Sequence, residues 1–254
     1  MNTFKILTMK HFIDAHAHMD RFLNPDMVVE ETKRLGGLAV VSAGYDHEAN
    51  QATLAVASRH NGFIFPVIGL APTAVMDLED AQFEKQFEFI KNNLDKCVAM
   101  GEIGLDFHWP TKQEQIDRQY KFFKCQLDYA LDNNAPVVIH SRKAEKEAID
   151  FLKERGAEKV LLHYFSGSPS LIRIAADEGY SFTVPPVKSR TRAKLVEEMP
   201  LECIMIESDS PYVTSHPSSV LTAAQLISEA KGISIEDVLK STTENAKRFF
   251  GLKI

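Results

Sequence analysis

The chain has 254 residues, of which 44% are hydrophobic and 25% are charged, and it contains 12 glycines and 11 prolines. This ordinary globular composition excludes collagen-like, low-complexity and intrinsically disordered proteins. The 29 Lys and Arg residues against 35 Asp and Glu residues give a net charge of −6, which argues against a broad basic face for nonspecific nucleic-acid binding.

Short apolar runs rich in β-branched residues alternate along the chain with longer segments of helical period. Several of these runs, such as VLL and CIMI, are almost continuously apolar, which is typical of parallel strands covered on both faces. Eight strands are predicted in chain order, at residues 11–16, 38–43, 64–70, 98–102, 136–140, 159–163, 180–184 and 203–207.

Helices are predicted between these strands. The clearest covers residues 113–133, where Phe123 and Leu127 belong to an apolar series at helical spacing. A final helix is expected to begin after Ser234, which can serve as its N-cap, and to end near Gly251.

Eight strands, each followed by a helix, predict an α/β fold: a (β/α)8 TIM barrel with an additional C-terminal helix. An open doubly wound sheet produces the same alternation and is the alternative. Because no Pro-, Gly- or Ser-rich linker and no change in composition divides the chain, we expect one domain over residues 1–254.

The cysteines Cys97, Cys125 and Cys203 lie far apart and form no CxxC pair. This spacing, together with the lack of a signal-peptide pattern, favours free thiols in the reducing cytoplasm. Residues 1–5 lead almost directly into the first predicted strand, and no apolar run approaches the roughly 20 residues of a membrane span. We therefore expect a soluble cytoplasmic protein without a membrane segment.

Two histidines end the first predicted strand. Because successive side chains on a strand point to opposite faces, His16 and His18 share one face and can meet on one ion. Neutral imidazoles suit zinc, iron, nickel or manganese better than calcium. Such a pair alone is weak support for a metal site, since packing or surface exposure explains it as well.

Further metal-capable side chains follow four later strands. Glu102, in the fourth strand, lies between Gly101 and Gly104. Buried acids are rare unless they are paired or metal-bound. Each of these histidines, considered alone, is most simply explained as a polar residue whose hydrogen bonds are satisfied within the fold. Together, however, the strand-end histidines and acids gather on the face where barrel active sites are built. The set is large enough for two metals that share an acid. These later residues are Glu102, His140, His163, Glu207 and Asp209.

The sequence resembles the TatD family of metal-dependent hydrolases, within the amidohydrolase-like barrels. The matching stretches are DAHAH, GEIGLDF, PVVIHSR, HYFSG, ESDSP and STTENAKRFFGL, in family order over nearly the whole chain. The resemblance implies DNase activity, often exonucleolytic, with divalent cations. It implies one metal held by His16, His18, Glu102 and Asp209, and a second held by the bridging Glu102 with His140 and His163.

Three positions depart from the family pattern. Ala71 stands where many members have a histidine, and Tyr164 stands where members commonly have a cysteine. Residues 212–217 replace a basic Arg-Gly-x-x-Asn stretch. None of these is an implied metal ligand, so the departures bear on substrate recognition.

The expected mechanism uses two divalent ions, which could be Zn, Mn, Mg, Ni or Fe, and a hydroxide that bridges them. Asp209 and the bridging Glu102 are the expected catalytic residues, with Asp209 orienting or deprotonating the nucleophile. Asp14, on the face of His16, and Glu207 are candidate partners that orient the ligands. For Glu207, a strand-end ion pair is the equally open alternative.

Substrate contacts are predicted near the same face. Arg142 is the leading candidate for binding a phosphate. His108 and Trp109 follow the fourth strand, and Trp109 could either stack on a base or cover the barrel rim. The basic segment 188–192 is more simply a solvated face.

These features favour a divalent-metal-dependent hydrolase, a TatD-type deoxyribonuclease or phosphodiesterase acting on DNA or another phosphodiester. One alternative is a metal-dependent hydrolase of a non-nucleic-acid ester, lactone or amide. Another is a non-catalytic metal-binding scaffold. The sequence leaves open the native metal, the exo or endo mode and the oligomeric state.

Overall fold

The computed structural model describes residues 11–254, so the predicted course of residues 1–5 lies outside the described residues. The strands are β1 (Phe12–Ala17), β2 (Gly37–Ala43), β3 (Ile64–Ile68), β4 (Ala99–Gly104), β5 (Val137–His140), β6 (Val160–Leu162), β7 (Ser181–Val184) and β8 (Ile204–Ile206). All eight predicted strands are present, with ends that differ by a few residues.

Helices follow the strands in turn. The α-helices are α1 (Pro25–Arg34), α2 (His47–Arg59), α3 (Pro72–Val75), α4 (Asp80–Lys91), α5 (Gln113–Asp132), α6 (Glu145–Glu154), α7 (Pro169–Asp177), α8 (Arg190–Glu198), α9 (Val220–Lys231) and α10 (Ile235–Phe250). The 3-10 helices are η1 (Met19–Arg21), η2 (Leu94–Lys96), η3 (Leu201–Cys203) and η4 (Pro217–Ser219). Within residues 11–254, none of the helices combines the length and the apolar character needed to cross a membrane.

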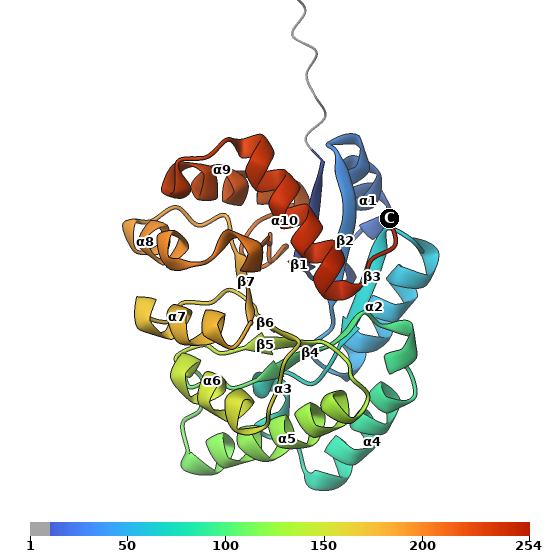
Figure 1. The fold of residues 1–254 in the computed structure, drawn as a ribbon. Helices are drawn as coiled ribbons and strands as arrows, with labels where there is room; N and C mark the ends of the chain where they lie inside the picture. The colour runs from blue at the N-terminus through green and yellow to red at the C-terminus, as the bar shows by residue number, and fades with distance from the viewer. Residues whose placement is uncertain (1–10) are drawn as a thin grey trace, which may run out of the picture.

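The strands form one parallel sheet in the order β1 to β8, and the helices surround it (Figure 1). Two backbone hydrogen bonds join its ends: the His18 amide donates to the Ser210 carbonyl at 2.7 Å, and the Asp209 amide donates to the His16 carbonyl at 3.0 Å. An open sheet would leave β1 and β8 as separate edges. The predicted TIM barrel is therefore confirmed, and the doubly wound alternative is wrong.

Apolar side chains from most of the strands form one buried cluster. Ile13, Val41, Val138 and Met205 belong to this cluster, which also includes Phe250 from α10. The side chain of Asn245, also on α10, donates to the carbonyls of Leu201 in η3 and Ile204 at the start of β8, at 2.8 Å each. The predicted C-terminal helix thus closes the amino end of the barrel, and the opposite end is free for a site.

The two most distinct sequence predictions for helices are confirmed. On α5, the buried side chains include Phe122, Phe123 and Leu127, at the spacing of one helix face. On α10, the Ser234 hydroxyl accepts from the Asp237 amide at 3.0 Å, as an N-cap does.

Candidate metal centre at the carboxyl end of the barrel

The structure brings all six sequence-predicted metal ligands together at the carboxyl ends of the strands. Three triads have donor atoms that all lie within 4.8 Å of one another. The triads are His16, His18 and Glu102; Glu102, His140 and His163; and His16, His163 and Asp209. Because Glu102 belongs to two triads and His16 to two, the six residues form one continuous cluster.

The two oxygens of the Glu102 carboxylate face different pairs of histidines. Oε1 lies 3.2 Å from Nε2 of His16 and 3.3 Å from Nε2 of His18. Oε2 lies 3.5 Å from Nδ1 of His140 and 3.8 Å from Nε2 of His163. This is the arrangement that a carboxylate needs to contribute one oxygen to each of two ions.

Asp209 lies beside the first pair of histidines, His16 and His18. Its Oδ1 lies 3.3 Å from Nε2 of His18 and 3.9 Å from Nε2 of His16. Asp209 has a positive φ of 47°, and Lys143 and Tyr164, which follow β5 and β6, have φ of 57° and 47°. Non-glycine residues rarely adopt this conformation, and where they do it is often at functional sites.

An unpaired nitrogen shows that this donor set fits a cation. Nε2 of His16 is buried and makes no aligned hydrogen bond with the described residues, although Glu102 Oε1 is only 3.2 Å away. A buried polar atom without a partner is costly, and a divalent ion between the two groups would supply that partner. Imidazole nitrogens and carboxylate oxygens are the ligands that such ions prefer.

Three of the histidines are oriented by acceptors on their other ring nitrogen. Nδ1 of His18 lies 2.8 Å from the carbonyl of Ala43, and Nδ1 of His163 lies 2.7 Å from Oε2 of Glu207. A carbonyl or carboxylate oxygen can only accept, so these nitrogens carry the ring protons. The remaining Nε2 atoms then face Glu102 and Asp209, and each can bind a metal ion once it carries no proton.

The third acceptor is Asp106, to which the sequence assigned no role. Its Oδ2 lies 2.8 Å from Nε2 of His140, which leaves Nδ1 of that ring free to face Glu102. Burial would raise the pKa of Asp106, but the hydrogen bond and charge of His140, together with backbone hydrogen bonds from His108 and Trp109, lower it. The only sequence signal for Asp106 is its place in GEIGLDF, four residues after Glu102.

The two predicted orienting acids have different partners. Glu207 accepts from His163, as above, and from the Thr183 hydroxyl at 2.7 Å. Asp14 instead holds the segment before Asp209, because it accepts from the Ser208 amide at 2.9 Å and from the Ser208 hydroxyl at 2.5 Å. Burial raises the pKa of Asp14 well above its usual value, in spite of these hydrogen bonds.

The charges within the cluster stabilise one another. Burial would raise the pKa of Glu102, but the neighbouring imidazoles, His16 and His140 foremost, hold it well below its usual value. Burial likewise opposes a charge on His163, yet the Glu207 and Glu102 carboxylates raise its pKa to about 10. The metal-free centre therefore holds protons where ions would bind.

Two glycines allow the Glu102 strand to approach its neighbour. A Cβ added at Gly104, which has a φ of +137°, would lie 2.1 Å from the carbonyl oxygen of His140. A Cβ at Gly101 would lie 2.7 Å from the carbonyl oxygen of Val138. A side chain at either position would therefore push the Glu102 strand away from β5.

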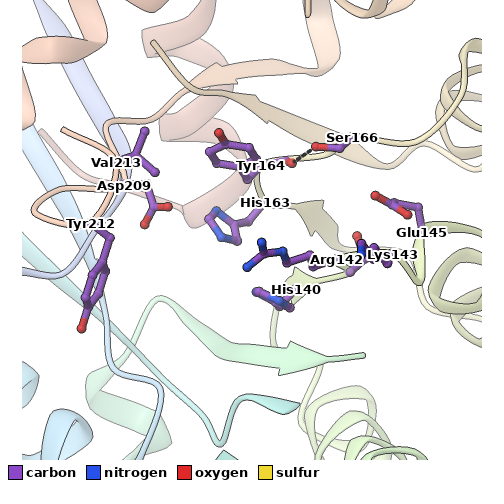
Figure 2. A pocket seen from close by; sticks show the side chains of 11 residues that line it. His140, Arg142, Lys143, Glu145, His163, Tyr164, Ser166, Asp209, Tyr212 and Val213 are labelled. Carbon is purple, nitrogen blue, oxygen red and sulfur yellow. Dashed lines mark hydrogen bonds between the residues drawn. The ribbon is translucent and has the colours of Figure 1, made fainter. Parts of the chain in front are cut away.

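A cavity of about 520 Å³ opens beside the cluster, between the loops that follow β5, β6 and β8. Figure 2 shows the guanidinium of Arg142 pointing toward His140 and His163, with Asp209 and Tyr212 on the other side. His16 and His18 do not line this cavity, and His18 is covered by the Tyr212 ring at a centroid distance of 4.9 Å. A substrate would therefore reach the cluster from the side of His140 and Asp209.

Comparison with known proteins identifies the family. The profile described as "TatD related DNase" matches residues 13–251. The chain belongs to this family. A human relative named "Deoxyribonuclease TATDN3" is 34% identical to the chain, with 94% of each sequence covered. The resemblance to the TatD family predicted from the motifs is thus confirmed.

Other relatives agree with this assignment. The "Uncharacterized metal-dependent hydrolase YabD" of Bacillus subtilis is 31% identical and covers 93% of this chain and 98% of the relative. The crystal structure of YJJV, a TatD homolog from Escherichia coli, shares the fold with a TM-score of 0.84 at 22% identity, covering 96% of this chain and 99% of that one. The Bacillus relative is named a metal-dependent hydrolase, and the cluster of this chain offers His, Glu and Asp side chains that could hold a metal ion.

The three predicted departures from the TatD family pattern differ in their position relative to the cavity. Tyr164 and Tyr212 line the cavity, and the Tyr212 hydroxyl is 3.0 Å from that of Tyr45. Ala71, by contrast, is buried before α3 and does not line the cavity. Two of the three departures therefore contribute side chains to the cavity wall.

Two predicted substrate residues lie outside the cavity lining. Trp109 is 54% exposed, and the Arg142 guanidinium lies 5.4 Å from its ring centroid. The His108 ring packs against Trp109 at a centroid distance of 4.7 Å. Only Arg142 of the three predicted residues thus reaches the cavity directly.

The prediction of a solvated basic face at residues 188–192 is wrong for Arg192. This side chain is only 6% exposed, and its guanidinium donates to the Phe165 carbonyl at 2.5 Å and to the Ser166 hydroxyl at 3.3 Å. It also lies 5.0 Å from the centroid of the Tyr164 ring. Arg192 is buried because it supplies donors to the loop after β6.

Substitution of Gly104 by alanine should destabilise the protein by about 3 kcal/mol, because the new Cβ meets the His140 carbonyl and the positive φ is strained. Gly156→Ala is the matched control, since Gly156 also has a positive φ, of +65°, but no atom within 4 Å of its Cβ position. It should cost only about 1–2 kcal/mol. Urea unfolding measures both, and equal losses would contradict the steric argument.

The substitution Glu207→Gln should lower the pKa of His163 by about one to three units, because it removes a charge in direct contact with the ring. In metal-free wild-type protein, His163 has a pKa raised to about 10. Its pairing therefore adds stability that is full below the unfolded pKa of about 6.5 and is lost as the pH rises toward 10.

NMR titration of the His163 ring and thermal unfolding of chelator-treated protein between pH 6 and 10 measure these two effects. An unchanged His163 pKa in the glutamine variant would show that Glu207 does not set it.

Proposed function

We propose that this protein is a divalent-metal-dependent hydrolase that cleaves phosphodiester bonds in DNA, and that it binds two ions. The observation that carries the proposal is the Glu102 carboxylate, whose two oxygens face two different pairs of histidines at 3.2–3.8 Å. The name of the human relative, a deoxyribonuclease, supports DNA as the substrate.

The proposed ligands of the first ion are His16, His18, Glu102 and Asp209, and those of the second are Glu102, His140 and His163. Zn, Mn, Mg, Ni and Fe are the candidate metals, and the histidine-rich ligand set suits Zn, Mn, Fe or Ni well. Bound ions of this kind lower the pKa of water toward about 7 and neutralise the charge that develops on a phosphate.

Asp209 is the proposed proton acceptor. Its carboxylate lies at the edge of the cavity, and its neighbours hold its pKa below the usual value in spite of burial, with the hydrogen bond from His18 foremost among them. It is thus an anion beside the position where a phosphate would lie. Glu207 and Asp14 serve this arrangement indirectly, the first by orienting His163 and the second by holding Ser208 next to Asp209.

Substrate binding is assigned chiefly to Arg142, whose guanidinium offers paired donors to a phosphate. Trp109 is proposed as a stacking surface for a base at the rim, with His108 supporting its ring. Recognition through these few groups is compatible with the net charge of −6.

We also propose that residues 1–254 form one TatD-like domain and that the protein acts in the cytoplasm. The family profile supports the first of these, since it matches residues 13–251 as one continuous unit. The free thiols of Cys97, Cys125 and Cys203 support the second, since unpaired cysteines are typical of a reducing compartment.

A hydrolase of a non-nucleic-acid ester is the second candidate. The cavity wall favours it, because Tyr164 and Tyr212 stand at departures from the family pattern and the negative charge of Glu145 offsets part of the positive charge of Arg142 and Lys143. Such a wall would suit a substrate with less charge than a DNA strand.

Asp209→Asn should lower kcat for hydrolysis of a single-stranded oligonucleotide by a factor of about 10³ or more, because the amide cannot accept a proton. Asparagine tolerates the positive φ at this position, so the fold should be retained. Nucleotide release is measured with Mg²⁺, Mn²⁺ or Zn²⁺. If the wild-type protein releases no nucleotide with any of them but hydrolyses an uncharged ester, the second candidate function is correct.

Arg142→Ala should raise KM for the oligonucleotide about tenfold, because a charge-assisted hydrogen bond to phosphate is lost. Arg173→Ala is the control, since Arg173 lies on α7 and pairs with Glu198 at 2.7 Å, away from the cavity lining. It removes the same charge and should leave KM unchanged. An equal rise in both variants would mean that only the overall charge matters.

A further inference from the structure

Asp106 is held by its side chain and by its backbone. Oδ2 of its carboxylate contacts Nε2 of His140 at 2.8 Å, and Oδ1 accepts from the His108 amide at 2.7 Å. The amides on either side of Asp106 continue the pairing with β5: Leu105 donates to the His140 carbonyl and Phe107 to the Arg142 carbonyl. Because alternate residues of a strand point their backbone groups in opposite directions, the amide and carbonyl of Asp106 face away from β5.

Gln119 supplies the hydrogen-bond partners of the Asp106 amide and carbonyl. Its Oε1 accepts from the Asp106 amide at 2.8 Å, and its Nε2 donates to the Asp106 carbonyl at 2.9 Å. Gln119 lies on α5 and is fully buried. A rigid helix is thereby linked through one amide group to the residue that orients His140.

We call this pairing of a glutamine side chain with the amide and carbonyl of one residue a clamp. The same helix carries a second clamp of identical chemistry. Gln126 lies two turns after Gln119 and is only 1% exposed. Its Oε1 accepts from the Leu70 amide at 2.8 Å, and its Nε2 donates to the Leu70 carbonyl at 3.0 Å. Leu70 follows β3, a segment that holds none of the proposed metal ligands. The two clamps therefore match in chemistry and burial but differ in what they hold.

We propose that Gln119 is a positioning residue for the second metal, acting through Asp106 to fix the orientation and the protonated nitrogen of His140. This inference rests on the proposed two-ion site. Outer partners of a metal-bound histidine set its ring orientation, and their loss commonly weakens metal binding by 10–100-fold. Displacement of Asp106 would turn the His140 ring away from Glu102 Oε2, whereas His16, His18 and Asp209 keep their own contacts.

The test compares Gln119→Leu with the matched control Gln126→Leu. Both variants leave one buried amide and one buried carbonyl unpaired, so both should lower Tm by similar amounts. Mn²⁺ binding is measured by equilibrium dialysis, and electron paramagnetic resonance detects the spin-coupled pair of Mn²⁺ ions. Gln119→Leu should bind one ion with wild-type affinity and a second at least tenfold more weakly, with loss of the pair signal. Gln126→Leu should bind both ions as the wild type does.

Equal effects of the two leucine variants on Mn²⁺ binding would overturn the proposal, since only stability would then be involved. If Gln119→Leu does not fold, Asp106→Asn decides: it keeps the clamp, removes the charge beside His140 and should also weaken the second ion at least tenfold. Wild-type affinity for both ions in Asp106→Asn would overturn the proposal.

The wild-type protein separates this inference from the proposed function. If it binds two Mn²⁺ ions but releases no nucleotide from DNA, the proposed substrate is wrong and the role of Gln119 stands. If it binds fewer than two ions, the two-ion site fails and the inference fails with it.

Discussion

The buried Glu102 carboxylate, shared between two pairs of imidazoles, is the interaction on which the rest of the centre depends. A carboxylate at this depth costs several kcal/mol of desolvation unless cationic or hydrogen-bonding partners compensate. His16 and His140 are the leading partners that keep it ionised. Its position depends in turn on Gly101 and Gly104, since a side chain at either would collide with the β5 backbone. An apolar strand thus delivers one anion to a point surrounded by nitrogen donors.

Each of three histidines is oriented from a different part of the barrel. The acceptor for His18 is the carbonyl of Ala43 in β2, that for His163 is Glu207 after β8, and that for His140 is Asp106 after β4. The three rings are therefore oriented by three separate contacts. A closed barrel can bring such contacts together, because every strand end has a fixed neighbour on both sides.

The cavity wall contains two tyrosines that stand at the predicted departures from the TatD family pattern. Tyr164 and Tyr212 line the cavity, and each is fixed by a further side chain, Arg192 behind the first and Tyr45 beside the second. Arg192 shows why composition alone misjudges such positions. A guanidinium in a basic segment looks solvent-exposed in the sequence, yet the carbonyl of Phe165 and the face of an aromatic ring hold it in the interior.

The apolar period of the sequence predicted the eight strands and the C-terminal helix, because such a period is a local property, and the motifs shared with the TatD family identified the six residues of the cluster. The sequence also placed Glu207 and Asp14 next to the ligands, but it could not tell which group each one holds. Three contacts became visible only in the folded chain: Asp106 faces His140, Gln119 pairs with the backbone of Asp106, and the Arg192 guanidinium is buried against the Phe165 carbonyl. Those contacts join residues 13 to 34 positions apart, and their geometry follows from how helices pack around the closed sheet, which no local pattern encodes.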